Sequence, residues 1–217
     1  MNPETKILKQ RLEEIRNTLL ELEFIKKDIK ALINLNEEHK KGALSESRFF
    51  TRLYLNYTRL FVIDIFKLTG KNEHHNIQKL LDFCKINRRK IEWYNQISLE
   101  KLNSLNDRLT EVSVKFEQIE GLRNKYYAHN DKKKYSFPYQ LSLTDLWGIL
   151  EGLQKIFSEI NLEFDNHHWY FDIQYNSPTI LQNISKYNKI RKLTLNENRQ
   201  NESSIETKKL IEIIRKK

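Results

Sequence analysis

The residues best suited to chemistry lie in one short segment, residues 121–131, which reads GLRNKYYAHND. Five residues separate Arg123 from His129, two of them tyrosines, and a run of lysines follows. A guanidinium offers a permanent charge and a planar set of donors to a phosphate, and an imidazole can take or give a proton near neutral pH. The segment therefore indicates attack on a phosphodiester without a metal ion.

The overall charge favours an anionic partner. The 217-residue chain has 38 lysines and arginines against 29 acidic residues, a formal net charge of +9. Nucleic acid is the first candidate for a protein of this charge. The alternative, that the lysines only form a solvated surface, is equally consistent with the charge alone.

The single cysteine and the hydropathy pattern exclude several classes of protein. With Cys84 alone, no intrachain disulfide and no zinc site built from several thiolates can form. Residues 1–6 lack the apolar core of a signal peptide, and the best apolar run, residues 60–66, is too short to span a membrane. We therefore expect a soluble, cytoplasmic protein without a membrane segment. There is no P-loop or GxGxxG motif, so no nucleotide cofactor is expected.

The elements that must position the segment are predicted to be helices. Five glycines and three prolines are few for this length, and apolar side chains recur every three or four residues. The pattern predicts an all-α fold: an antiparallel helical bundle with a long N-terminal helix and a basic C-terminal extension. We divide the chain into the bundle, residues 1–177, and the partly helical extension, residues 178–217. The expected helices cover residues 4–36, 45–69, 76–84, 98–116 and 144–162.

The second of these helices, residues 45–69, is expected at the centre of the core. It is apolar nearly all round, and Gly70 is placed to end it. Asp64 within it needs a partner, for which Arg52 and Arg59 are the candidates.

The chemical segment lies between two of the predicted helices. We expect the helix that begins at residue 98 to continue, with a kink at Gly121, into the segment. The segment then forms the last turns of a helix that ends near His129. Thr144 is expected to cap the next helix.

The order of Arg123, Asn124, a short spacer and His129 resembles the signature of the HEPN superfamily. The long apolar helix before it and the capped helix after it also resemble that all-α bundle. The phrase RNKYYAHND is most similar to the abortive-infection U-type (AbiU) group, a branch that acts in phage defence. The resemblance covers about residues 45–162, and the two ends of the chain are weaker matches.

The resemblance implies an RNA endonuclease that works without a metal ion or cofactor. In such an enzyme His129 would take the proton of a ribose 2′-OH or protonate the leaving 5′-oxygen. Arg123 would stabilise the charge that builds up on the phosphate, and Asn124 would orient either group or donate to the phosphate. The product would carry a 2′,3′-cyclic phosphate, and DNA would not be cut because it lacks the 2′-OH.

The spacing of the motif also bears on the oligomeric state. Six steps along a regular helix place Arg123 and His129 about 120° apart around the axis and about 9 Å apart along it. The two side chains therefore do not meet on one ideal helix. Either the helix unwinds near residues 128–129, or motifs from two copies of the chain build one groove. Proteins of the HEPN superfamily are typically dimers in which the motifs of both copies build one groove. The resemblance therefore implies a homodimer with a shared basic cleft.

Neighbouring residues can serve either structure or RNA binding. Arg123 can instead pair with Glu117 or Glu120, and His129 can simply be favoured by the dipole at a helix C-terminus. The two tyrosines are better suited to packing than to base stacking. The candidates for RNA binding are the lysines around the motif: Lys125, Lys132, Lys133 and Lys134.

The other histidines occur as adjacent pairs, at residues 74–75 and 167–168. Sequential neighbours point away from each other on a helix or strand, so a shared metal ion is not expected.

Two other functions fit the same residues. The protein can be a non-catalytic RNA-binding member of the same fold, or a protein-interaction module, with an antitoxin or another defence protein as its partner. In the last case the long first helix is the expected docking surface. One family variant carries a tyrosine shortly after the histidine, which a partner nucleotidyltransferase modifies. Here Asn130, Asp131 and Lys132 follow His129, which speaks against that partner.

Overall fold

The structure is a computed structural model that describes residues 1–38, 47–124 and 141–172 and, toward the C-terminus, residues 174, 176, 179–184, 186–187, 190 and 193–201. The regular secondary structure of these residues is helical throughout, with no strand, so the predicted all-α fold is confirmed. The main helices are α1 (Pro3–Glu38), α3 (Arg48–Thr69), α4 (Ile77–Asn87), α5 (Leu99–Ser113), α6 (Phe116–Gly121) and α7 (Leu143–Asp165).

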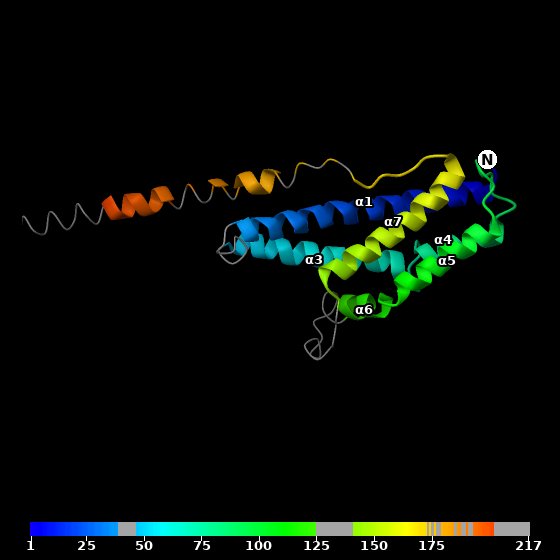
Figure 1. Cartoon of the computed structure of the whole chain (residues 1–217), viewed down its shortest axis with the longest axis horizontal. Helices are drawn as coiled ribbons and strands as arrows, with labels where there is room; N and C mark the ends of the chain where they lie inside the picture. The colour runs from blue at the N-terminus through cyan, green and yellow to red at the C-terminus, as the bar shows by residue number, and fades with distance from the viewer. Residues whose placement is uncertain are drawn as a thin grey trace, which may run out of the picture.

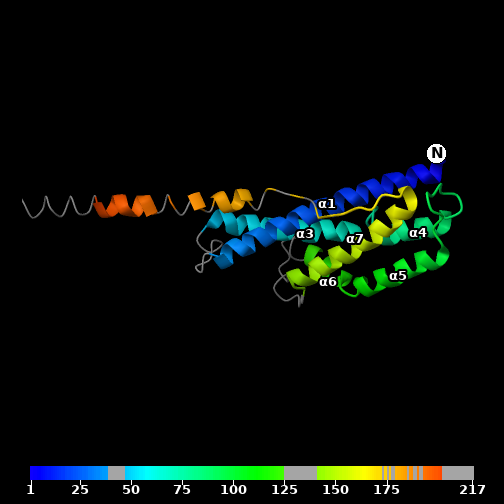
Figure 2. The ribbon, with the colours of Figure 1, turned by 45° about the horizontal axis from the view of Figure 1, so that its top comes forward.

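The helices are arranged around α1, the longest of them (Figure 1). α3 lies beside α1 and runs in the opposite direction, and α7 crosses α1 diagonally, also in the opposite direction (Figures 1 and 2). α5 packs against both α4 and α7, and the short helix α6 contacts α3. Among the described helices, none combines the length and the apolar character that a membrane span requires.

The three- and four-residue periodicity of α1 and α7 produces the core. Both helices bury one apolar face against the rest of the molecule, which is the main source of stability for an amphipathic helix. In α1 the exception is Ile7, which is periodic in the sequence but exposed. The buried residues of these two helices include Leu8, Leu12, Ile15, Leu19, Leu22, Ile29, Leu146, Ile149, Leu150, Leu153, Ile156, Phe157 and Ile160.

α3 differs from the prediction of a helix that is central over its whole length. Its C-terminal half is buried, with Phe61 and Phe66 in the core. In its N-terminal half Phe49 is 60% exposed and Leu55 is 57% exposed. There α3 extends past the end of α7, and of the labelled helices only α1 lies beside it (Figure 1). One side of this half therefore faces outward.

The ends of the helices also differ in detail from the prediction. Ser142, not Thr144, caps α7: its hydroxyl accepts the Asp145 N–H at 3.1 Å, and the Asp145 carboxylate accepts the Ser142 N–H at 2.9 Å. This reciprocal capping box satisfies two backbone donors at once. The helix break falls at residues 114–115, between α5 and α6, rather than at Gly121.

The predicted partner of Asp64 was wrong. Its carboxylate pairs with Lys67 at 2.6 Å, and not with Arg52 or Arg59. Lys67 is three residues further along the helix, which places the two side chains side by side. Neither arginine has the three- or four-residue spacing that such a contact requires.

After α7 the chain turns back over the bundle. Asn166 adopts the left-handed conformation, with φ 59°, and its N–H donates to the Leu162 carbonyl at 3.0 Å. The following residues, 167–172, lie across α7, where the Ser158 hydroxyl donates to the Trp169 carbonyl at 3.1 Å. Phe171 is buried in the core.

Part of the C-terminal extension contacts the bundle. Leu181, in the helical residues 179–184, is buried in a small cluster with Leu32 of α1 and Phe50 of α3. The helical residues 193–201 lie beyond the end of α1 (Figure 1). The division of the chain at residue 177 stays a prediction.

Candidate functional site

Arg123 and Asn124 lie in a π-helical turn, residues 122–124, that follows α6 directly. The Leu122 N–H donates to the carbonyls of both Gln118 and Ile119, so the turn continues the helix without a break. Ile119 and Leu122 are buried, which anchors the turn in the core. π-helical residues within α-helices are often found at functional sites.

The guanidinium of Arg123 is held on two sides. Its Nη1 donates to Asn124 Oδ1 at 2.7 Å, and its Cζ lies 5.0 Å from the centre of the Phe66 ring. Such cation–π contacts contribute about 0.5–1 kcal/mol at exposed sites and more where water is excluded. The arginine is only half-buried, so it remains accessible.

No carboxylate in the described part of the chain forms an ion pair with Arg123, so the alternative pairing with Glu117 or Glu120 is not seen there. Asn124 is a neutral partner and occupies one of the five guanidinium N–H groups. A planar fork that keeps its charge and several donors is well suited to a phosphate.

Gly70 is what allows the Phe66 ring to lie where it does. A Cβ atom at Gly70 would be 2.8 Å from Phe66 Cζ and 2.9 Å from Glu73 Cγ, closer than real contacts allow. Gly70 ends α3, as the sequence predicted, but with φ −68° it adopts extended backbone. The glycine is therefore needed for space and not for a left-handed turn.

The loop between α3 and α4 is fixed by its own hydrogen bonds. The Gly70 N–H donates to the Phe66 carbonyl at 2.7 Å, and the Asn76 side-chain amide donates to the Gly70 carbonyl at 2.7 Å. Asn76 also caps α4 by accepting the Lys79 N–H at 2.7 Å. These bonds fix the floor on which the ring of Phe66 rests, and sequence analysis did not identify this support.

Most of the predicted site residues lie outside the described part of the chain. His129 and the four candidate lysines, Lys125, Lys132, Lys133 and Lys134, belong to residues 125–140, which the structure does not describe. The structure brings Arg123 and Asn124 together. The meeting of Arg123 with His129 stays a prediction.

The described residues on either side of residues 125–140 are anchored in the fold. Leu122 is buried on the first side, and Ser142 with Asp145 forms a capping box on the second. The Asp145 carboxylate also accepts a hydrogen bond from the Lys115 ammonium, between α5 and α6. Hydrogen bonds from Lys115 and then from Ser142 hold the pKa of Asp145 well below its usual range.

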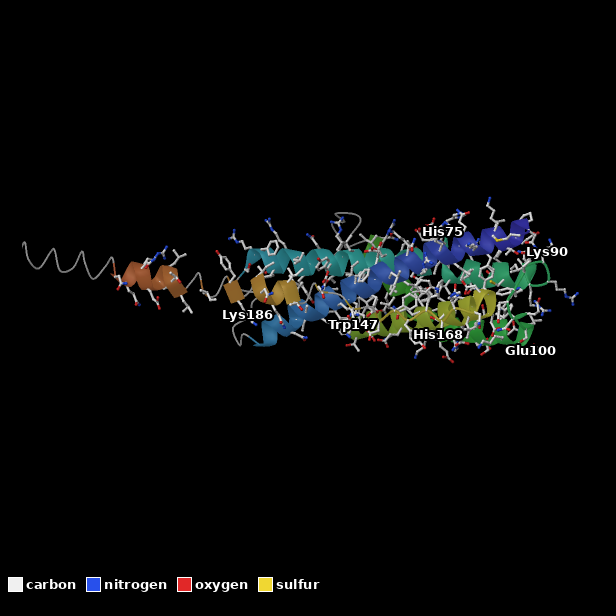
Figure 3. All side chains as sticks on the ribbon, turned by 90° about the horizontal axis from the view of Figure 1, so that it is seen from above. His75, Lys90, Glu100, Trp147, His168 and Lys186 are labelled. Carbon is white, nitrogen blue, oxygen red and sulfur yellow. The ribbon has the colours of Figure 1, made fainter. Side chains whose placement is uncertain are left out.

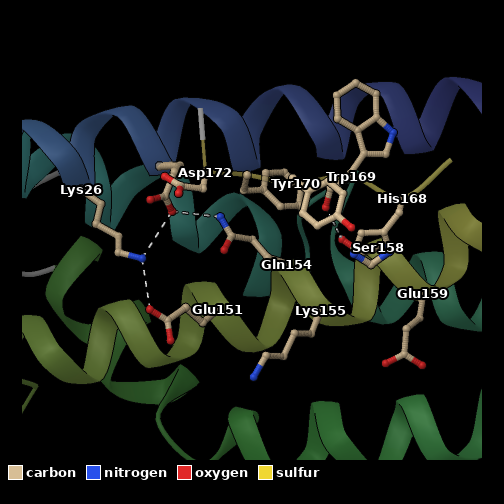
Figure 4. A pocket seen from close by; sticks show the side chains of 12 residues that line it. Lys26, Glu151, Gln154, Lys155, Ser158, Glu159, His168, Trp169, Tyr170 and Asp172 are labelled. Carbon is tan, nitrogen blue, oxygen red and sulfur yellow. Dashed lines mark hydrogen bonds and ion pairs between the residues drawn. The ribbon is translucent and has the colours of Figure 1, made fainter. Parts of the chain in front are cut away.

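A hollow of about 480 Å³ lies between α1, α7 and residues 168–172, away from Arg123 (Figure 4). Its floor carries a buried ion pair, in which Lys26 Nζ lies 3.4 Å from Glu23 Oε2. Lys26 Nζ also lies 3.1 Å from Oε1 of Glu151, whose side chain is exposed. Gln154 donates to the same Glu23 oxygen at 3.2 Å. These polar groups of the floor bind one another, as buried charges usually do. The pairing therefore has a structural role and does not indicate a ligand site.

The adjacent histidine pairs do not gather further ligands around them. His74 and His75 stack edge to face, with ring centres 4.4 Å apart (His75 is labelled in Figure 3). Burial and, next, the neighbouring His74 lower the pKa of His75. In the part of the chain that the structure covers, no group of three or more His, Cys, Asp or Glu side chains is arranged to hold a metal ion.

An all-α fold with an Arg–Asn pair directly after α6 agrees with the class that the motif suggested, the HEPN-type proteins. The family model HEPN_AbiU2, described as AbiU2, matches the chain over residues 5–212. The chain therefore belongs to the HEPN_AbiU2 family, and the resemblance to the AbiU group is confirmed. The match includes α1 and most of the C-terminal extension, beyond the residues on which the resemblance was based. No curated protein and no solved structure gives a significant match to the chain.

Proposed function

We propose that the protein is a metal-independent endoribonuclease of bacterial phage defence. In this reaction the ribose 2′-oxygen attacks the adjacent phosphorus, and the bond from phosphorus to the 5′-oxygen breaks. His129 removes the 2′-OH proton or supplies the proton that the 5′-oxygen needs as it leaves. The products are a 2′,3′-cyclic phosphate and a free 5′-OH.

The observation that carries the proposal is the setting of Arg123. Its guanidinium rests on an aromatic ring and is oriented by the neutral amide of Asn124. Charge that develops on the non-bridging phosphate oxygens then meets a donor that is already in place, which is how such groups stabilise a transition state. Membership of the HEPN_AbiU2 family supports the same assignment.

The reaction is tested with purified protein and total RNA in EDTA. We expect the wild type to cut RNA and leave 2′,3′-cyclic ends, and we expect DNA of the same sequence to stay intact. Arg123→Ala and His129→Ala should each lower the rate at least about 100-fold, the typical contribution of a phosphate donor or a general acid–base. Cleavage that persists in both variants would remove these residues from the mechanism.

The shared groove of a homodimer has a separate test, which mixes the two inactive variants. After refolding together, about half of the dimers contain one chain of each kind, and these carry one intact arginine and one intact histidine. If Arg123 of one protomer acts with His129 of its partner, the mixture regains activity that neither variant has alone. A mixture as inactive as its components would place both groups on the same chain.

The non-catalytic alternative predicts a different result in the same assay. An RNA-binding member of the family binds RNA with an affinity that falls steeply with salt but does not cut it. An interaction module instead retains a specific protein partner, such as an antitoxin, and loses it when α1 is altered. The charge and accessibility of Arg123 favour a function on RNA over the interaction module, and cleavage in EDTA separates the two functions on RNA.

A further inference from the structure

The outward side of α3 carries a row of residues that leads to Arg123. The members follow one another at alternating steps of three and four residues, which places them along one face of the helix. The N-terminal half of α3 forms an outer edge of the molecule (Figure 3). The members of the row from Phe49 to Arg59 are exposed. In order along the helix the whole row is Phe49, Arg52, Asn56, Arg59, Ile63 and Phe66.

The charge of this row is positive and is not balanced by neighbouring acids. Asp64 is the only acidic residue of α3, and Lys67 pairs with it. Within the described residues, neither Arg52 nor Arg59 forms an ion pair, although the sequence suggested both as partners of Asp64. Two exposed guanidinium groups are therefore left for an anion that comes from outside the described chain.

The row extends along α3 to Phe66, the residue whose ring contacts Arg123. Arg52, Arg59 and Phe66 are seven residues apart, so successive members lie about 10 Å apart along the axis. Phe66 carries the guanidinium of Arg123 on its ring, at 5.0 Å from the ring centre. Three guanidinium groups thus follow one line, about 20 Å long, on one side of the molecule.

The side chains between the arginines also suit a nucleic acid. Asn56 offers an amide to phosphate or base edges, and Phe49 is an exposed aromatic ring at the far end of the row. A track of cations with an aromatic ring for base stacking is the usual way to bind a single strand without sequence preference.

We propose that this row, from Phe49 to Arg59, is a phosphate track that binds the single-stranded RNA beside the scissile bond and leads it to Arg123. The inference rests on the proposed ribonuclease function and names the surface that its substrate occupies. A second copy of the chain is a poorer occupant, because a two-fold contact through this row would bring arginines against arginines.

The test measures binding of a single-stranded RNA with 2′-O-methyl riboses, which the proposed reaction cannot cut. The double variant Arg52→Gln/Arg59→Gln is compared with the wild type. The control is a second double variant, Arg89→Gln/Lys155→Gln, which also removes two exposed cations.

Each phosphate contact on a single strand contributes about 0.7 to the slope of log affinity against log salt. Two lost contacts lower the slope by about 1.4. Between 50 and 200 mM salt, wild-type affinity should then fall about sevenfold more than that of the Arg52/Arg59 variant.

The control variant should keep the wild-type slope. With a cleavable RNA, the Arg52/Arg59 variant should raise KM and leave kcat unchanged, because the track acts in binding and not in the chemical step. Equal slopes for the Arg52/Arg59 variant and the control would overturn the track. So would a change from dimer to monomer in sedimentation equilibrium, which would make the row an interface between copies.

The outcome also separates the track from the proposed function. If the wild type cuts RNA in EDTA but the Arg52/Arg59 variant binds like the control, only the track is wrong. If the wild type neither binds nor cuts RNA, both the phosphate track and the proposed ribonuclease function are wrong.

Discussion

Gly70→Ala tests whether the Phe66 ring positions Arg123 for phosphate. The backbone of Gly70 has φ −68° and ψ 131°, a conformation that alanine adopts freely. The new Cβ would lie 2.8 Å from Phe66 Cζ and 2.9 Å from Glu73 Cγ. The substitution therefore acts through a steric clash with the Phe66 ring and not through strain in the backbone.

The size of the effect follows from these distances. Carbon atoms in contact prefer about 3.5–4.0 Å, so the ring must move by about 1 Å or the loop must open by as much. The Arg123 guanidinium rests on that ring. A displacement of about 1 Å at a catalytic group costs on the order of 100-fold in rate, and overpacking of this kind costs about 1–3 kcal/mol of stability. We expect RNA cleavage to fall about 100-fold in a protein that remains folded.

Two other glycines supply matched controls. A Cβ at Gly152 would lie 2.7 Å from Val112 Cγ2, between α5 and α7, so Gly152→Ala overpacks the core without touching Phe66. A Cβ at Gly148 meets nothing within 4 Å, so Gly148→Ala should only gain the helix propensity of alanine, about 1 kcal/mol. Cleavage rates and urea unfolding are measured for all three variants.

If Gly70→Ala, at equal folded fraction, cuts RNA as fast as Gly152→Ala, the Phe66 ring does not position Arg123 for cleavage. A readout without RNA is the NMR signal of the Arg123 Nε–H, which the ring current of Phe66 affects. It should move in Gly70→Ala and keep its position in Gly152→Ala.

Three further predictions concern the bundle that holds the site. Because hydrogen bonds from Lys115 and Ser142 lower the pKa of Asp145, its contribution to stability is complete above the unfolded value of about 3.9 and is lost as pH falls toward the lower folded value. Asp145→Asn should thus lower the urea midpoint at pH 7, with a difference from wild type that shrinks below about pH 4. Burial raises the pKa of Cys84 to about 12, so iodoacetamide at pH 8 should label it only after unfolding, as mass spectrometry can show. Leu181→Ala should cost about 2 kcal/mol, at the low end for a buried leucine, and loosen residues 179–184, so that trypsin cuts after the neighbouring Lys186 earlier than in the wild type.

The sequence predicts well what depends on neighbours along the chain. The buried faces of α1 and α7 follow from apolar residues at three- and four-residue steps, and burial of such a face does not depend on which helix covers it. The cap of α7 is also encoded locally, since Ser142 and Asp145 have the spacing of a capping box, and this pair outweighs Thr144 as a cap.

Features that depend on distant parts of the chain could not be predicted in the same way. One side of the N-terminal half of α3 is exposed because α7 does not extend alongside it, and no pattern within α3 records how far another helix reaches. The contact of Arg123 with Phe66 joins two helical segments that lie far apart in sequence. The motif singled out Arg123, but the contact with the Phe66 ring and the role of Gly70 became visible only in three dimensions.

The neutral partner of Arg123 makes a prediction that separates phosphate binding from simple structural pairing. Asn124 Oδ1 accepts from the guanidinium at 2.7 Å, and an aspartate at this position would make the same contact with a full negative charge. If Arg123 had only a structural role, Asn124→Asp would strengthen its anchoring and leave RNA binding unchanged. If Arg123 binds phosphate, the carboxylate competes with the phosphate for the same donors, as charge-assisted pairs of this kind are the stronger ones. We therefore expect Asn124→Asp to keep or raise the urea midpoint while weakening RNA binding by about tenfold, the equivalent of about 1.4 kcal/mol. Unchanged RNA affinity in this variant would show that the guanidinium does not contact the strand.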